Sequence, residues 1–488
     1  MKGKHIFNRL RDRISLQFKR VLLFPYYLDY RQWEREKKVS FLINICLGII
    51  LGVAFLPLLR LQLMENIFNS TMDKMIRKET AAFMKIPECR IPSPSLNLAE
   101  CERLSGRLSK DIVFIDIDNS TYTGWGEPLF IPRNEIARFL KLADKNEAKV
   151  VALDILFDYP SYNPGEDVEL RSVLKDLTKR QSGLRIIFPT IKSSIDNKIR
   201  KNIFDDLIDN NPNFYRGFPY ESFSRSDRVV RYIRYYTIAK GRDGRNMVLW
   251  TVPVLSAALF TNDFSKLKAL EPKILDDSDN HRTEKYGIEL SNKNKTRLEI
   301  GNNELFSNRI RFALIPPGTF HGEGEKGNLY PRQFFPGDID TLQQTLKDKV
   351  VIIGTSSRDK ESWHRTPVGD MPGMYIIGNA TNVLLENWQI RETPLWVVFS
   401  VNIVVILFAC YMFVHCYPSV ARTIAMVFGA LLLIPVTNYF YTKYGIVINA
   451  MFLFMNLVVP IMAMGWYKIH KNIRRIALGT LLRIISRY

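Results

Sequence analysis

Four long apolar windows constrain this chain more than any other feature of its sequence. They cover residues 39–59, 395–415, 423–441 and 445–467. Each is long enough for a helix that crosses a hydrocarbon layer of roughly 30 Å. The mainly polar stretch 60–393 between the first and second windows is long enough for a folded domain with its own core. The sequence therefore predicts one N-terminal and three C-terminal transmembrane helices with a large domain inserted between them.

The net charge of +19 is concentrated at the two ends of the chain. Residues 1–38 contain 11 Lys and Arg against 4 Asp and Glu, and residues 468–488 contain 6 against none. Basic residues beside a span mark its cytoplasmic side, so both ends are expected in the cytoplasm and 60–393 outside it. Positive charge beside spans indicates a lipid bilayer as the partner and argues against nucleic acid.

Both ends are also amphipathic, since apolar residues recur among the basic ones in 1–22 and in 468–488. Such segments either lie on anionic lipid or dock a protein, and the sequence leaves both interpretations open. We expect any signal to leave the chain through these ends or through the helix bundle, towards a cytoplasmic or membrane partner that the sequence does not identify. Self-association as a homodimer is a further alternative.

The polar stretch has the pattern of an α/β domain. Apolar runs typical of strands buried on both faces of a parallel sheet occupy residues 112–118, 149–155, 184–190 and 349–355. Helical patterns occupy 133–148, 166–179 and 374–387. Because strands and helices alternate, we predict a doubly wound, mainly parallel sheet with right-handed crossovers.

The rest of the domain is less regular. The runs 228–239 and 309–317 are interpreted as further strands, and 262–308 as an insertion or long hairpin. Apolar residues at three- and four-residue spacing over 60–80 predict a helix after the first window.

Two of the five cysteines lie in the predicted exported domain. Cys89 and Cys101 flank a segment rich in Pro and Ser. A disulfide between them would contribute roughly 3 kcal/mol in the chain-entropy model. We predict this disulfide; two unpaired thiols are the alternative. The other cysteines, in or beside the windows, are expected to pack as small apolar side chains.

Polar side chains follow several of the predicted strands. In doubly wound sheets ligands bind outside the carboxyl ends of the strands. Asp118, Asp154, Thr355 and Ser356 fall at such ends, and Arg133 at the start of a helix could reach the same edge. These residues are candidates for binding a small polar or zwitterionic ligand. The alternative is that the aspartates cap the following turns or pair with arginines.

Motifs for metal or covalent chemistry are missing from the sequence. There is no C-x-x-C, no H-E-x-x-H and no G-x-S-x-G, and the six histidines are scattered. We therefore expect no metal site, no cofactor and no catalytic residue.

An ordered set of short motifs resembles the CHASE type-2 domain, an extracytoplasmic sensory domain of bacterial receptors. The set begins with I-D-I-D at Ile115–Asp118, Pro132-Arg133 and the run 148–157. It continues with Val229-Val230-Arg231, KVVIIGT at 349–355, Thr366-Pro367 and Met371-Pro372-Gly373. The resemblance covers about 65–390, and the three closely spaced windows after it are also similar to the family's arrangement.

Two positions depart from the family pattern. Asp227-Arg228 stands where relatives tend to have Asp-Gly, and Ile377-Gly378 replaces a His-Ala pair. The cyclase or histidine kinase that usually follows the domain is also missing from this sequence. The resemblance implies a sensor in the bacterial inner membrane whose output comes from a separate protein. A membrane-tethered exported enzyme and a structural subunit of a membrane complex are the alternatives.

Overall fold

The structure is a computed structural model. It describes residues 62–83, 111–179, 183–219, 227–279, 286–291, 297–300, 309–314, 333–334, 346–357 and 363–392, with isolated positions at 400, 403, 407, 439–441 and 446–447. The chain divides into two compact units, one of residues 1–71 with 392–488 and one of residues 72–391. Nearly all described residues belong to the second unit.

The four apolar windows lie almost wholly outside the described residues, as do Cys89 and Cys101. None of the described helices is both long and apolar enough to cross a membrane.

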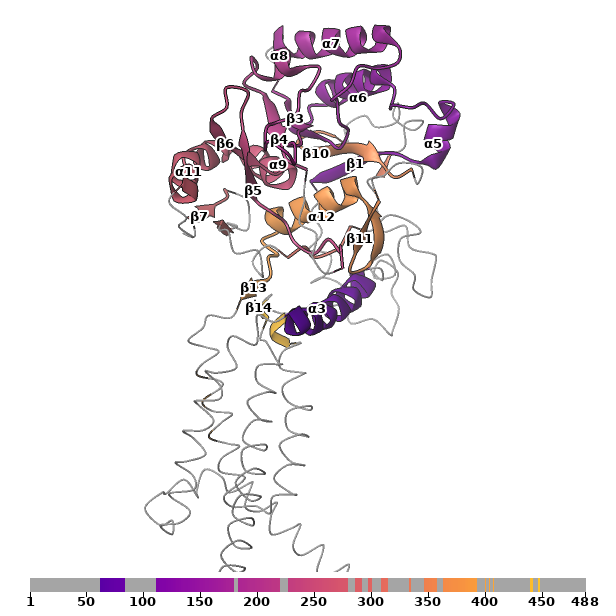
Figure 1. The fold of residues 1–488 in the computed structure, drawn as a ribbon. Coiled ribbons are helices and arrows are strands. Elements are labelled where there is room, and N and C mark those ends of the chain that lie inside the picture. The colour runs from indigo at the N-terminus through magenta and orange to yellow at the C-terminus, as the bar shows by residue number, and fades with distance from the viewer. Residues whose placement is uncertain are drawn as a thin grey trace, which may run out of the picture. The chain divides into compact units, whose positions relative to one another are not determined.

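A six-stranded parallel sheet forms the centre of the second unit (Figure 1). Its strands lie in the order β4 (Phe214–Gly217), β3 (Arg185–Pro189), β2 (Val150–Leu153), β10 (Val350–Thr355), β1 (Ile112–Ile117) and β9 (Gln333–Phe334). Ile112 pairs with Val350, and Val350 pairs in turn with Val150. The last strand of the predicted set, β10, is therefore inserted between the first two.

Helices cover both faces of this sheet, as predicted (Figure 1). On one face lie α6 (Arg133–Lys145) and α7 (Pro164–Lys179), and on the other lie α9 (Val252–Phe260) and α12 (Gly373–Leu385). All pairs within the sheet are parallel. The prediction of a doubly wound α/β domain is confirmed for this unit.

The core beneath α6 and α7 is built from alternate residues of the strands. These residues are Val113, Ile115, Ile117, Val151, Leu153, Ile186, Phe188, Val351 and Ile353. The stripe predicted on the two helices packs on them and consists of Ile136, Leu140, Ala143, Leu170, Val173, Leu174 and Leu177. Strand residues of the opposite parity face α9 and α12, which explains why the strands are apolar throughout.

Smaller elements complete the described part of the chain. The helices are α3 (Gln62–Phe83), α5 (Asn119–Gly124), α8 (Asp205–Ile208), α10 (Phe264–Lys268) and α11 (Glu271–Asp279). The strands are β5 (Tyr236–Lys240), β6 (Asn246–Trp250), β7 (Tyr286–Glu289), β8 (Arg297–Ile300), β11 (Trp363–Thr366), β12 (Gly369–Pro372), β13 (Arg391–Glu392) and β14 (Ile446–Val447). Helix α3 confirms the helix predicted over 60–80, and the β7–β8 hairpin lies within the predicted insertion.

Two strand predictions are wrong in extent. In the run 228–239 only β5, from Tyr236 on, forms a ladder, and it pairs with β6. Residues 309–314 form a single bridge, from Arg309 to Tyr232, and no ladder. The periodicity of both segments indicates burial, and both are buried over most of their length. Many of their backbone groups bond to isolated partners and to side chains of helices, so burial here does not require a sheet.

Candidate functional site

Asp118 begins helix α5 directly after β1. Its carboxylate accepts hydrogen bonds from the backbone N–H of Thr121 at 2.9 Å and from the hydroxyl of Ser120 at 3.0 Å. These contacts cap the helix, because a side-chain oxygen satisfies an N–H that has no partner within the helix. The capping role that the sequence left open is thus what Asp118 performs in this structure.

Arg133 lies where α6 meets α7 and the segment that follows β2. Its guanidinium lies 4.4 Å over the ring of Phe157 and 3.9 Å from the Asp167 carboxylate. Its Nη2 donates to the carbonyl of Leu156 at 3.4 Å, and its backbone N–H donates to Glu166 at 2.9 Å. Burial lowers the pKa of Arg133, although Asp167 and Glu166 oppose that shift. In this position Arg133 joins the two helices.

Asp154 follows β2 and lies beside Gly354 of β10, since its backbone N–H donates to the carbonyl of Ile353. Its carboxylate is partly buried and makes no hydrogen bond or ion pair within the described part of the chain. Burial raises its pKa to about 6. An acid held in this way at a strand end is a candidate for binding a cation or a proton.

Thr355 and Ser356 end β10 between the two aspartates. The Thr355 hydroxyl donates to the carbonyl of Ile117 at 2.8 Å. The Ser356 N–H donates to the same carbonyl at 3.2 Å and to the buried carboxylate of Asp116 at 3.1 Å. The next residue, Ser357, is fully buried, and its hydroxyl has no partner among the described residues.

We call residues 116–118, 154 and 354–357 the carboxyl edge. The register of β2, β10 and β1 brings these residues together on three adjacent strands. The structure thus gathers four of the five predicted site residues there and places Arg133 elsewhere. The carboxyl edge offers hydroxyl groups and carboxylates, and Asp154 has no cation beside it among the described residues, so its chemistry suits a small polar ligand that carries a positive charge or a donor group.

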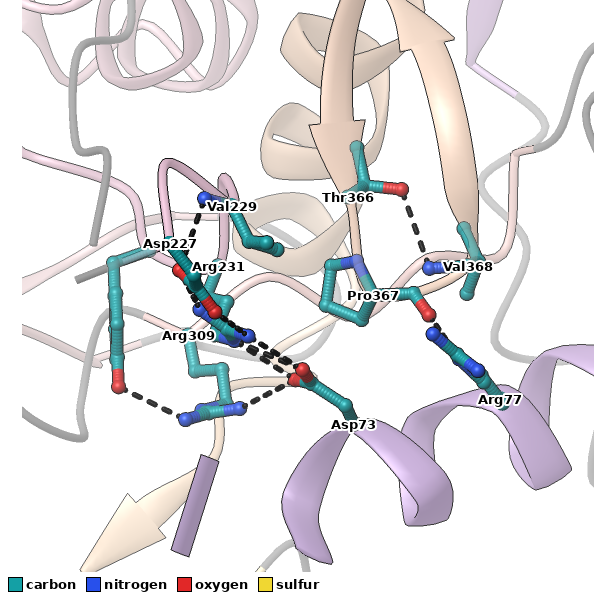
Figure 2. A network of polar contacts seen from close by, with 10 residues as sticks. Asp73, Arg77, Asp227, Val229, Arg231, Arg309, Thr366, Pro367 and Val368 are labelled. Atoms are coloured by element: carbon teal, nitrogen blue, oxygen red, sulfur yellow. Dashed lines mark hydrogen bonds and ion pairs between the residues drawn. The ribbon is translucent and has the colours of Figure 1, made fainter. Parts of the chain in front are cut away.

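A second polar network, which sequence reasoning missed, ties α3 to the rest of the unit (Figure 2). Asp73 of α3 accepts three hydrogen bonds from Arg231, at 2.7 to 3.0 Å, and lies 3.5 Å from Arg309. Asp227 also accepts from Arg231, at 2.7 Å. Burial alone would lower the pKa of Arg231, but the hydrogen bonds that it donates to Asp227 and Asp73 raise its pKa above the usual value. We call Asp73, Asp227, Arg231 and Arg309 the α3 clamp.

Three more contacts from α3 extend this attachment. Glu79 lies 3.5 Å from the buried guanidinium of Arg311, and the Thr80 hydroxyl donates to the carbonyl of Phe312 at 2.6 Å. Arg77 donates to the carbonyl of Pro367 (Figure 2). Residues 309–314, which we call the strap, therefore lie along α3 and are held by it at three successive points.

The sequence did carry a signal for this network. Arg231 stands in the apolar run 228–239, and Arg309 and Arg311 alternate with apolar residues at the start of 309–317. A charged side chain inside an apolar run must be paired when it is buried. The partners Asp73 and Glu79 lie more than 150 residues away, so the pairing itself could not be read from spacing.

Metal-binding clusters are absent from the described residues, since no group of three His, Cys, Asp or Glu side chains converges there. Neither the carboxyl edge nor the α3 clamp assembles such a set.

Comparison with known protein families identifies a domain in this chain. The model of the CHASE2 domain family matches residues 46–414, about three quarters of the chain. The resemblance read from the motifs is thereby confirmed, and every element from α3 to α12 lies inside the matched range. No curated protein and no solved structure matches the chain.

Proposed function

The chain belongs to the CHASE2 domain family, and on that premise we propose that it is a sensor of the bacterial inner membrane. In this proposal the unit 72–391 is exported, detects an extracytoplasmic signal, and passes it to a separate partner protein. CHASE2 domains are a family of sensory domains, which supports sensing in general. The family match over 46–414 is the observation that carries the proposal, because it runs from inside the first apolar window to inside the second.

The membrane location is supported by the apolar windows and by their basic flanks. The windows are long enough to span a bilayer, and the basic residues of 1–38 and 468–488 favour the cytoplasmic side. With both ends inside, the polar stretch between the first two windows lies outside.

The carboxyl edge is the part of the exported unit where we propose that the signal binds. It lies where doubly wound sheets bind ligands, and Asp154 there lacks a partner among the described residues. A small polar compound with a positive charge or a donor group fits its chemistry.

The output is proposed to reach a partner through the basic amphipathic ends. Crosslinking in cells that express the tagged full chain, followed by purification, should recover a distinct cytoplasmic or membrane protein. Deletion of 1–30 or 470–488 should lose it while the exported unit keeps its resistance to protease. A variant with 470–488 scrambled at constant composition is the control, since it keeps the attraction to anionic lipid. Recovery of this chain alone, before and after crosslinking, would refute the transfer to a partner.

One observation favours a membrane-tethered enzyme as the second candidate. Asp154 is an acid with a raised pKa at a strand end, and perturbed acids of this kind are common in active sites. The guanidinium of Arg133, which the sequence analysis grouped with Asp154 at this edge, lies 3.9 Å from Asp167 and donates to the carbonyl of Leu156 instead. Turnover of a substrate that disappears in Asp154→Asn would put the enzyme first.

A further inference from the structure

We propose that helix α12 is a relay that couples the carboxyl edge of the sheet to helix α3. Tyr375 is its contact at the carboxyl edge, and Asn379, one turn later, is its contact with the strap. The inference rests on the proposed function and specifies how binding at the carboxyl edge is transmitted within the exported unit. Tyr375 and Asn379 are positioning residues in this scheme.

The first contact of the relay is a buried hydrogen bond from α12 to the sheet. The hydroxyl of Tyr375 donates to Asp116 Oδ2 at 2.9 Å, while the other oxygen of that carboxylate accepts the Ser356 N–H at 3.1 Å. Tyr375 and Asp116 are almost completely buried. A ligand that draws Ser356 away therefore changes the acceptor that holds Tyr375. In a site of low polarity such a change is felt strongly.

The second contact is the side-chain amide of Asn379. Its Oδ1 accepts from the N–H groups of Ala313 and Leu314 at 2.7 and 2.6 Å, and its Nδ2 donates to the carbonyl of Leu314 at 2.6 Å. The same Nδ2 donates to the carbonyl of Tyr375 at 2.8 Å. The side-chain amide takes the place of a neighbouring strand, because it satisfies backbone N–H and C=O groups of the buried strap. The position of the strap therefore depends on α12.

The third contact is the strap's attachment to α3. Phe312 accepts from the Thr80 hydroxyl at 2.6 Å, directly before the two residues that Asn379 holds. Arg311 and Arg309 reach Glu79 and Asp73 on the same helix, each at 3.5 Å. If the strap moves, either α3 moves with it or the ion pairs between them break. Breaking buried ion pairs costs free energy, so we expect α3 to move.

Because α12 is closely packed on the sheet, we expect the helix to shift as a rigid unit when one of its contacts changes. Two glycines allow α12 and the sheet to approach each other closely. Gly378 of α12 packs against the side chain of Phe114 of β1, and Gly354 of β10 packs against the side chain of Met374 of α12. The ring of Tyr375 stacks on Phe114 at 4.6 Å between centroids. Interiors packed in this way change by discrete shifts of whole elements more readily than by local deformation.

Hydrogen–deuterium exchange of the full chain in lipid nanodiscs tests the relay. We expect Tyr375→Phe to speed exchange of the α3 amides in 72–83 by about fivefold or more, because it removes one buried hydrogen bond at the far end of the relay. Tyr122→Phe is the matched control: it also removes a tyrosine hydroxyl bond, to the carbonyl of Pro128, and should leave α3 unchanged.

A second variant, at the opposite end of the relay, ensures that the test does not depend on Tyr375→Phe alone. Thr80→Val has nearly the same shape but removes the hydroxyl that holds Phe312, one of the contacts between α3 and the strap. It should speed exchange at 355–357, since coupling between two sites acts equally in both directions. Unchanged exchange at the distant segment in both variants would overturn the relay, as would an equal rise in α7, which would indicate general destabilisation. Neither result would affect the membrane location or the transfer to a partner, which the crosslinking experiment tests separately.

Discussion

Gly378 of α12 lies directly on the ring of Phe114 of β1, so that a Cβ at Gly378 would stand 2.6 Å from Phe114 Cε1. The contact is possible only because glycine has no side chain, since real Cβ atoms do not approach other atoms so closely. Helix α12 can approach the sheet this closely because residue 378 is glycine.

We predict that Gly378→Ala destabilises the exported unit although alanine favours helices. The gain in helix propensity is about 1 kcal/mol, whereas overpacking of a filled core costs about 1–3 kcal/mol. Gly124→Ala in α5 is the control, because no atom lies within 4 Å of the position its Cβ would take. Chemical denaturation of both variants beside the wild type checks this, and a Gly378→Ala variant as stable as the wild type would show that Phe114 moves away without cost.

The contacts of the α3 clamp predict that substitution of Asp73 strongly lowers the stability of the exported unit. Asp73→Asn removes the carboxylate that Arg231 and Arg309 share in the buried network, and breaking such a network costs about 3 kcal/mol. Asp243→Asn, which loses only the exposed pair with Arg245, should have no measurable effect. Equal unfolding curves for Asp73→Asn and the wild type would mean that the clamp does not hold α3.

The raised pKa of Asp154 predicts that the stability of the exported unit depends on pH. Its native pKa of about 6 lies above the ordinary 3.8, so the folded state binds the proton more tightly. The wild type should therefore lose stability as the pH rises from about 4 to about 6, and remain less stable above that range. Asp154→Asn should be more stable than the wild type at pH 8, by about 3 kcal/mol, and the gain should vanish near pH 3. A constant difference between the two proteins across this range would contradict the raised pKa.

The fold could be predicted from sequence where the spacing of apolar residues matches the buried face of a strand or helix. Four of the six strands of the sheet, the helices α6, α7 and α12, and the buried stripes of α6 and α7 follow from apolar periodicity. The placement of β10 between β1 and β2 does not, because β10 is about 200 residues from β2 in sequence and the order of strands depends on pairing between distant segments.

The candidate site was predictable only in part, for a similar reason. A strand end can be recognised from sequence, so Asp154, Thr355 and Ser356 were placed correctly at one edge. The direction of a long side chain cannot be recognised in this way: the guanidinium of Arg133 lies near Asp167, whose position depends on how α7 packs. The strap was mistaken for a strand because a buried extended segment has the same periodicity whether a strand or an asparagine amide satisfies its backbone.

The disulfide between Cys89 and Cys101 stays a prediction, since both residues lie outside the described part of the chain. Mass spectrometry of the non-reduced protein, alkylated before digestion, should find the two cysteines linked in one peptide pair. Alkylation of both thiols would refute it. Because the oxidising side of the membrane is required for such a bond, a positive result would also support export.

The location of the domain is the central claim, and fused reporters test it most directly. A reporter that is active only in the cytoplasm should be inactive when inserted after residue 291 and active when fused after residue 488. A reporter that requires the oxidising exterior should give the opposite pair of results. Activity of the cytoplasmic reporter at residue 291 would place the domain inside the cell and contradict the proposed sensor.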